Sequence, residues 1–157
     1  MSNLLGKPAP AFTLFDTDKK ATSLADFKGQ NVVVLFFPLA FTGVCTTELC
    51  SIRDNIGTYN SSNAQVLGIS VDSIFTLGKF KEEQKLNFPL LSDFNKTASK
   101  SFDALYEVFP AFEMQGVSKR AAFVIDKEGV VQYAEICPTP GDLPNFEAIQ
   151  TVLNTLN

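Results

Sequence analysis

The residues with the clearest capacity for chemistry lie in the stretch Phe37-Pro38-Leu39-Ala40-Phe41-Thr42-Gly43-Val44-Cys45-Thr46-Thr47-Glu48-Leu49-Cys50. This stretch follows an apolar, β-branched run, Val32 to Phe37, that predicts a buried strand, and it precedes a segment with a helical spacing of apolar residues. Pro38 and Gly43 interrupt the chain between the two elements. We therefore expect Cys45 in the first turn of a helix that begins just after a strand.

A cysteine at such a position is placed to react as a thiolate. The first turn of a helix presents unpaired backbone N–H groups and the positive end of the helix dipole, and both favour a negatively charged sulfur. The chain contains no histidine, which excludes Cys–His pairs and Ser–His–Asp triads. A nucleophile here must be activated by a backbone dipole, a cation or hydrogen bonds.

Composition restricts the class of protein. The 157 residues, 45% of them hydrophobic and 19% charged, predict one globular domain spanning residues 1–157. A net charge of −4 does not favour nucleic acid or anionic membranes as partners. The longest apolar run, Val32 to Phe41, is shorter than the ~18 residues of a spanning helix. Met1 to Phe12 lacks the pattern of a signal peptide, so a soluble, cytoplasmic protein is expected.

The cysteines favour redox or catalytic chemistry over a structural role. There are three of them, too few and odd in number for a secreted disulfide framework. In a reducing compartment they are expected to be free, catalytic or redox-cycling. A closed zinc site requires four ligands, and without histidine we expect no metal and no cofactor.

Apolar periodicity and turn residues predict the order of the elements. Strands are expected at Ala11–Leu14, Ala21–Ser23, Asn31–Phe37, Gln65–Val71, Phe88–Leu91, Ala121–Asp126 and Val130–Ile136, and helices at Val44–Tyr59, Ser73–Lys85, Ala98–Tyr106 and Leu143–Leu156. The first two strands would form a hairpin, the next two a parallel βαβ unit, and the last two an antiparallel hairpin closed by Lys127-Glu128-Gly129. The order predicts an α/β, thioredoxin-like fold: a central mixed sheet with flanking helices and an added N-terminal β-hairpin.

The pattern Pro38-x-x-x-Thr42-x-x-Cys45 resembles the signature of the peroxiredoxins, the AhpC/TSA family of thiol peroxidases. Further matches are Gly6-Lys-Pro-Ala-Pro-Ala-Phe-Thr-Leu14, Phe88-Pro-Leu-Leu-Ser-Asp93 and Arg120-x-x-Phe-Val-Ile-Asp126. These flanks resemble the AhpE-like members. The Cys45-x-x-x-x-Cys50 pair is similar to the peroxiredoxin Q, or bacterioferritin comigratory protein, class.

The resemblance implies a role for each residue of the signature. Cys45 would attack the peroxide and become a sulfenic acid, Thr42 would hydrogen-bond the thiolate and the peroxide, and Pro38 would shield the sulfur. Arg120 would supply a permanent positive charge that stabilises the Cys45 thiolate and binds the peroxide. Without the resemblance, Cys45 could be a buried small side chain, Thr42 an N-cap and Pro38 a strand terminator. Arg120 would then be no stronger a candidate for a site residue than Arg53, the other arginine of the chain.

Three further residues carry weaker expectations. The resemblance makes Cys50 the resolving cysteine that forms a disulfide with Cys45; the alternative is a core residue. Glu48 occupies a position that is often acidic or polar in the family, and its alternative is a helix-surface carboxylate. Cys137 has no family role that we can assign, so it is either a spectator or an alternative resolving thiol.

The function that the resemblance implies is reduction of hydrogen peroxide and organic hydroperoxides, with recycling by thioredoxin or another thiol reductant. It allows a monomer or a homodimer. A one-cysteine peroxidase or redox sensor would use the same Cys45 chemistry. A thiol–disulfide oxidoreductase would share the fold, but it normally carries Cys-x-x-Cys, and position 48 is glutamate. A metal-binding module lacks ligands.

Overall fold

The structure, a computed structural model, describes residues 3–156; the ends of the predicted domain at Met1, Ser2 and Asn157 lie outside the described residues. The elements in chain order are β1 (Thr13–Asp16), β2 (Ala21–Ser23), the 3₁₀ helix η1 (Leu24–Phe27), β3 (Asn31–Phe36), α1 (Gly43–Asp54), α2 (Ile56–Ser61), β4 (Ala64–Ser70), α3 (Ile74–Gln84), β5 (Leu90–Ser92), α4 (Thr97–Ser101), β6 (Ala121–Ile125), β7 (Val131–Ile136) and α5 (Phe146–Leu156).

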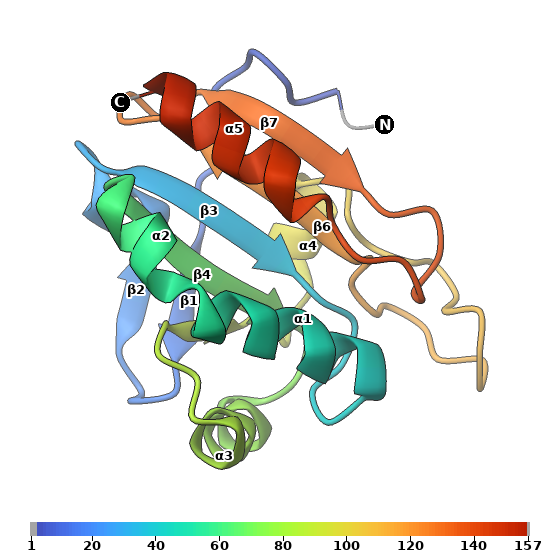
Figure 1. Cartoon of the computed structure of the whole chain (residues 1–157). Coiled ribbons are helices and arrows are strands. Elements are labelled where there is room, and N and C mark those ends of the chain that lie inside the picture. The colour runs from blue at the N-terminus through green and yellow to red at the C-terminus, as the bar shows by residue number, and fades with distance from the viewer. Residues whose placement is uncertain (1–2, 157) are drawn as a thin grey trace.

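One mixed sheet organises the molecule (Figure 1). Its seven strands lie in the order β2-β1-β5-β4-β3-β6-β7. Strands β3, β4 and β5 run parallel, whereas β6 pairs antiparallel with β3, and β7 pairs antiparallel with β6. The N-terminal hairpin joins the same sheet because β1 pairs antiparallel with β5. This arrangement confirms the predicted α/β, thioredoxin-like fold with its added hairpin.

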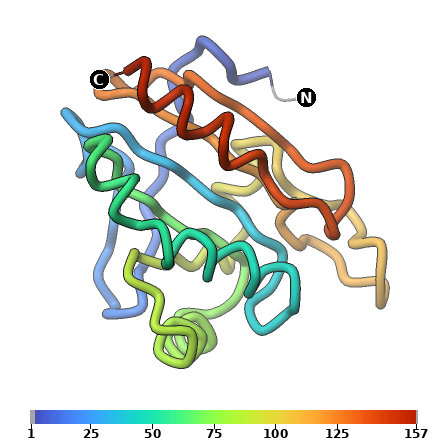
Figure 2. The backbone as a smooth tube through the Cα atoms, viewed as in Figure 1, coloured from blue at the N-terminus to red at the C-terminus, as the bar shows by residue number. Residues whose placement is uncertain are grey.

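Apolar side chains cover both faces of the sheet. Strand β3 is buried along its whole length, as its continuous apolar run predicts. Val33 and Leu35 face the layer formed by α1, α2, α3 and α5, while Val34 and Phe36 face the layer formed by α4, η1 and the N-terminal segment. Figures 1 and 2 show α1, α2 and α5 in front of the sheet and α4 behind it. Strand β3 is thus the centre of the core, and α1 leaves from its carboxyl end.

The long helix predicted from Val44 to Tyr59 is wrong, because two helices occupy that range. Helix α1 begins one residue earlier, at Gly43, and ends at Asp54. Asn55 has backbone angles outside the helical range, and its side-chain amide donates to the carbonyl of Ser51 over 2.8 Å. A short polar side chain that binds a backbone carbonyl competes with helix propagation. Helix α2 (Ile56–Ser61) then follows α1 after this one-residue break.

The helix predicted from Ala98 to Tyr106 is shorter than expected. The Asp93 carboxylate accepts hydrogen bonds from the backbone N–H groups of Ala98 and Ser99, which holds the start of α4. The helix ends at Ser101, and Asp103 takes a left-handed φ of 60°. The chain then forms a bridge between Leu105 and Ser118 instead of a further helical turn.

The remaining boundaries differ by a few residues. The first strand runs from Thr13 to Asp16 instead of Ala11 to Leu14. It ends later than predicted because the Asp16 carboxylate accepts from the N–H groups of Asp18 and Lys20 and so forms the turn after residue 16. The last helix begins at Phe146, after the Asn145 side chain caps its first turn by accepting from the Ala148 N–H.

Phe102 provides a test of the packing behind the sheet. Its ring is fully buried and contacts the rings of Phe12, Phe36 and Phe123 at centroid distances of 6.0, 5.3 and 5.0 Å. Phe102→Ala should therefore lower the free energy of unfolding by about 3–5 kcal/mol in guanidinium titrations. The matched control is Phe94→Ala, at a position that is 62% exposed, which should change it by no more than about 0.5 kcal/mol. Equal effects of the two substitutions would contradict the described core.

Candidate active site

The loop between β3 and α1 is held by the neighbouring strand β4. The Phe37 N–H donates to the Ile69 carbonyl over 3.0 Å, which extends the pairing past the end of β3. The Ala40 N–H donates to the Asp72 carboxylate over 2.8 Å, and the Ser70 hydroxyl holds the same carboxylate oxygen at 2.6 Å. Phe41 takes a left-handed φ of 67°. These contacts fix the direction in which the chain enters α1.

Cys45 lies in the first turn of α1, as its position in the sequence predicts. It is the third residue of the helix, and its side chain is fully buried. Residues in the first turn have no intrahelical partner for their N–H groups, so the positive end of the helix lies at this sulfur. Cys45, Cys50 and Cys137 are all free thiols.

The guanidinium of Arg120 joins Cys45 to the rest of the site. Arg120 directly precedes β6, whose antiparallel pairing sets Ala121 opposite Phe36 at the end of β3. Its Nη2 donates to the Cys45 Sγ over 3.3 Å and to the Pro140 carbonyl over 2.9 Å. Its Nη1 donates to Glu48 Oε1 over 2.6 Å. The side chain is only 2% exposed, so this cation is withdrawn from solvent and directed at the sulfur.

Glu48 is the partner of Arg120, and its interpretation as a helix-surface carboxylate is wrong. Its side chain is 0% exposed and its carboxyl forms a buried ion pair with Arg120. Burial raises the pKa of Glu48 to about 7, and the charge of Arg120 opposes that rise. The second carboxyl oxygen, Oε2, is buried and has no hydrogen-bond partner within residues 3–156.

Thr42 and Pro38 lie in the loop before α1, and the Thr42 hydroxyl makes a different hydrogen bond from the expected one to Cys45. Thr42 takes the N-cap position with an extended backbone, yet its side chain caps no helical N–H. Its hydroxyl donates to the Leu39 carbonyl over 2.7 Å, and among the described residues no hydrogen bond joins it to Cys45. Pro38 is buried two residues after the end of β3. The structure thus brings Cys45, Arg120 and Glu48 into direct contact and sets Thr42 and Pro38 on the adjoining loop.

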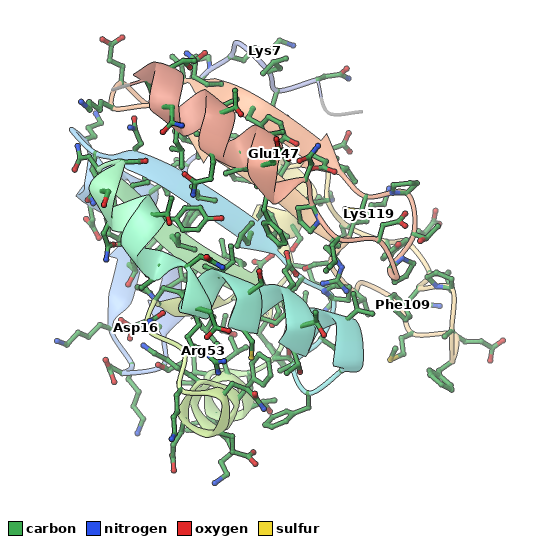
Figure 3. The ribbon with its side chains drawn as sticks, in the orientation of Figure 1. Lys7, Asp16, Arg53, Phe109, Lys119 and Glu147 are labelled. Atoms are coloured by element: carbon green, nitrogen blue, oxygen red, sulfur yellow. The ribbon has the colours of Figure 1, made fainter. Side chains whose placement is uncertain are left out.

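Cys50 lies further along α1 and faces another helix. Its thiol is partly exposed and donates to the side-chain carbonyl of Gln84, the last residue of α3, over 3.5 Å. One turn further on, the Arg53 guanidinium donates to the Gln84 backbone carbonyl. Figure 3 shows Arg53 near α3, away from the loops that carry Phe109 and Lys119. Of the two arginines, only Arg120 is part of the site.

Cys137 lies next to the site but is not prepared to react. It is buried after the end of β7, and its N–H donates to the Arg120 carbonyl over 2.8 Å. Burial, together with the negative charges of Glu135 and Glu48, raises the pKa of the Cys137 thiol to about 11. A thiol with that pKa stays neutral at physiological pH and is a weak nucleophile.

Comparison with known proteins assigns the chain to a family. The AhpC/TSA family model matches residues 5–134. The chain belongs to this family, the peroxiredoxins. It is 36% identical over 140 residues to alkyl hydroperoxide reductase E of Mycobacterium bovis, with 88% of each chain covered. It is 40% identical over 144 residues to a chloroplastic 2-Cys peroxiredoxin of Spinacia oleracea, and the match covers 85% of this chain but only 52% of that relative. This chain therefore spans about half the length of the plant protein.

A solved structure of similar fold extends the comparison over the whole chain. The peroxidoxin BcpB of Mycobacterium tuberculosis superposes with a TM-score of 0.86 at 26% identity, covering 100% of this chain and 99% of that one. Within residues 3–156, no helix combines the length and apolar character needed to cross a bilayer. Over the same range, histidine, cysteine and acidic side chains nowhere gather in a group able to hold a metal ion.

Two features of this peroxiredoxin site were underweighted or missed from sequence. Glu48 follows Cys45 by three residues, which sets both on one face of α1 and was a usable signal of burial. The Pro140 carbonyl accepts from both Nε and Nη2 of Arg120. No sequence pattern could have identified this contact, because any residue can supply a backbone carbonyl.

The raised pKa of Cys137 predicts which thiols react in the folded protein. At pH 8 only about one Cys137 in a thousand would be ionised, because the pH lies about three units below its pKa of about 11. We expect iodoacetamide to alkylate the partly exposed Cys50 and to leave Cys137 unmodified, as peptide mapping would show. All three thiols should react in protein unfolded with guanidinium. Similar labelling rates for Cys50 and Cys137 in the folded protein would contradict this assignment.

Proposed function

We propose that this chain is a thiol-dependent peroxidase that reduces hydrogen peroxide and organic hydroperoxides through Cys45. The single observation that carries the proposal is the 3.3 Å contact from Arg120 Nη2 to the Cys45 Sγ at the start of α1. A permanent cation and a helix N-terminus stabilise a thiolate, and the same groups stabilise the negative charge that develops on a peroxide oxygen.

The reaction follows from a negatively charged Cys45 sulfur beside the positive charge of Arg120. The Cys45 thiolate attacks one peroxide oxygen, an S–O bond forms, and the O–O bond breaks with its electron pair on the departing oxygen. The sulfur is oxidised to a sulfenic acid, and the peroxide is reduced to an alcohol or water once the departing oxygen gains a proton. Because the Cys45 side chain is fully buried, the peroxide must enter by displacing neighbouring side chains.

We assign the loop before α1 to peroxide binding. Thr42 would donate to the peroxide, which requires its hydroxyl to leave the Leu39 carbonyl that it now contacts. Pro38 would exclude water from the sulfur, which its burial supports. Arg120, which keeps its charge at any physiological pH, would bind the peroxide oxygen as well as the sulfur.

We further propose that Cys50 resolves the sulfenic acid as an intramolecular disulfide. On an ideal helix, five residues give a rise of ~7.5 Å and a rotation of ~140°, so the two Cα atoms lie roughly 8–9 Å apart. A disulfide tolerates at most ~7 Å, and α1 is continuous from Gly43 to Asp54. The first turns of α1 must therefore unwind. Each backbone hydrogen bond lost costs ~1 kcal/mol net, which is within reach of a local opening.

The biological setting belongs to the same proposal. Thioredoxin or a similar thiol reductant would reduce the disulfide, and relatives named 2-Cys peroxiredoxin and alkyl hydroperoxide reductase support a thiol-linked cycle. We propose that residues 1–157 act as one domain, in the cytoplasm, as a monomer or homodimer. We assign no cofactor, nucleic acid or membrane to the cycle. If Cys50 does not resolve, the protein is a one-cysteine peroxidase or sensor served by an external thiol.

Removal of the reactive sulfur tests the peroxidase assignment. Cys45→Ser should abolish peroxide consumption, with turnover lowered at least about a thousandfold, because a hydroxyl is a far weaker nucleophile than a thiolate. The assay couples hydrogen peroxide consumption to a thioredoxin system. Cys137→Ser is the matched control and should retain activity within about twofold, since that thiol is neutral. Residual turnover of Cys45→Ser within tenfold of the unsubstituted protein would reject Cys45 as the nucleophile.

The resolving role of Cys50 predicts a local conformational change. Formation of the Cys45–Cys50 bond should remove hydrogen-exchange protection from residues 44–52 and leave the sheet protected, as exchange mass spectrometry would show. Cys50→Ser should let the sulfenic acid persist and proceed to sulfinic acid with excess peroxide. If peptide mapping of the oxidised protein finds no Cys45–Cys50 disulfide, an external thiol resolves the sulfenic acid and Cys50 is a packing residue.

A further inference from the structure

One guanidinium serves two acidic groups in this site. Arg120 Nη2 contacts the Cys45 sulfur at 3.3 Å, and Nη1 contacts Glu48 Oε1 at 2.6 Å. Cys45 and Glu48 are three residues apart on one helix and are both completely buried. If both groups were ionised, two negative charges would share one positive charge out of contact with water. Burial of such an uncompensated charge is unfavourable, so the pair is expected to retain one proton.

The geometry of Glu48 indicates that it can hold this proton. Only one of its carboxyl oxygens receives a hydrogen bond; Oε2 is buried without a partner in residues 3–156. An ionised carboxylate with a buried oxygen that receives no donor loses solvation without compensation. Protonation at Oε2 removes that charge and leaves Oε1 free to accept from Arg120.

The groups around Glu48 come from four elements, and few of them can change charge near neutral pH. Helix α1 contributes Cys45, and Arg120 before β6 remains charged. Tyr59 of α2 and Cys137 after β7 stay neutral, since burial raises the pKa of each. Glu135 of β7 adds a negative charge that favours protonation of Glu48. Burial raises the pKa of Glu48 to about 7, so its protonation can change within the physiological range.

Building on the proposed peroxidase reaction, we propose that Glu48 exchanges its proton in step with the oxidation of Cys45. While the sulfur is a thiolate, Arg120 is neutralised by it and Glu48 is protonated. When the sulfur becomes a neutral sulfenic acid, Arg120 is left with Glu48 alone, and Glu48 ionises. Glu48 thus acts through Arg120 as a residue that balances the charge of the site.

The proton balance of the step shows what this exchange accomplishes. With hydrogen peroxide, the thiolate and the peroxide give a sulfenic acid and a hydroxide, and the hydroxide needs one proton to leave as water. If Glu48 releases one proton in the same step, the site as a whole takes none from solvent. If Glu48 is ionised throughout, or is replaced by glutamine, that proton must come from solvent. The two cases differ by one proton for each Cys45 oxidised.

A proton count during one turnover tests the proposal. Reduced protein receives one equivalent of hydrogen peroxide in weakly buffered solution, and a pH indicator records the uptake of protons. If Glu48 is protonated beside the thiolate and ionised beside the sulfenic acid, the unsubstituted protein should take up fewer than one proton per oxidised Cys45, with a count that changes with pH between about 6.5 and 8.5. Glu48→Gln, which keeps an acceptor for Arg120 Nη1, should take up about one proton at every pH. All proteins in this experiment also carry Cys50→Ser, so that no disulfide forms, α1 stays folded around Glu48, and the count refers to the sulfenic acid alone.

Glu128→Gln is the matched control for loss of a carboxylate outside the site. Glu128 is exposed in the turn between β6 and β7, and its variant should keep the proton count of the unsubstituted protein at every pH. Mass spectrometry of the same samples records oxidation at Cys45. Without such oxidation, the proposed peroxidase function fails. With oxidation but a proton count that is independent of pH and identical in Glu48→Gln, the coupling is overturned while the peroxidase function stands.

Discussion

The buried guanidinium of Arg120 is the interaction on which the site depends. It bridges the loop after β7, helix α1 and the start of β6 through hydrogen bonds to Pro140, Glu48 and Cys45. Loss of one partner from a buried ion pair typically costs about 3–5 kcal/mol, because the other charge is left unpaired. The cation therefore has two roles: it holds helix α1 against the sheet, and it stabilises negative charge on the Cys45 sulfur.

The sheet makes this contact available. Antiparallel pairing of β6 with β3 sets the first residue of β6 beside the last residue of β3, so Arg120 and the loop leading to Cys45 lie at the same edge.

The two acidic groups beside Arg120 would repel each other if both were ionised. Negative charges on Cys45 and Glu48 about 5–6 Å apart, as expected for side chains at i and i+3, repel by about 3 kcal/mol at an effective dielectric constant near 20. That repulsion exceeds the contribution of most single hydrogen bonds. The site therefore depends on the balance of charge among Cys45, Glu48 and Arg120 as well as on the positions of these side chains.

Local features of the site were predictable from sequence, and the pairings between distant segments were not. The strand, the loop and the first turn that hold Cys45 are read directly from apolar periodicity and breaker residues. The Arg120–Glu48 contact joins residues 72 positions apart, and no local pattern distinguishes Arg120 from Arg53; only the family resemblance selected it. The predictions of helix at Asn55 and after Ser101 were wrong for two different reasons. The Asn55 side chain binds the Ser51 carbonyl and interrupts the first helix, whereas the left-handed Asp103 and the Leu105–Ser118 bridge end the second.

Helix α1 must satisfy two opposed requirements if Cys50 resolves the sulfenic acid. A folded first turn holds Cys45 against Arg120, while a disulfide needs the segment between the two cysteines to unwind. Glu48 lies inside that segment, so unwinding also separates it from Arg120. Several backbone hydrogen bonds at about 1 kcal/mol each cost about as much together as the ~3–5 kcal/mol typical of breaking a buried ion pair, although the β-branched Thr46 and Thr47 weaken the helix. Both therefore resist opening, and the protonation of Glu48 sets how large the contribution of its contact with Arg120 is.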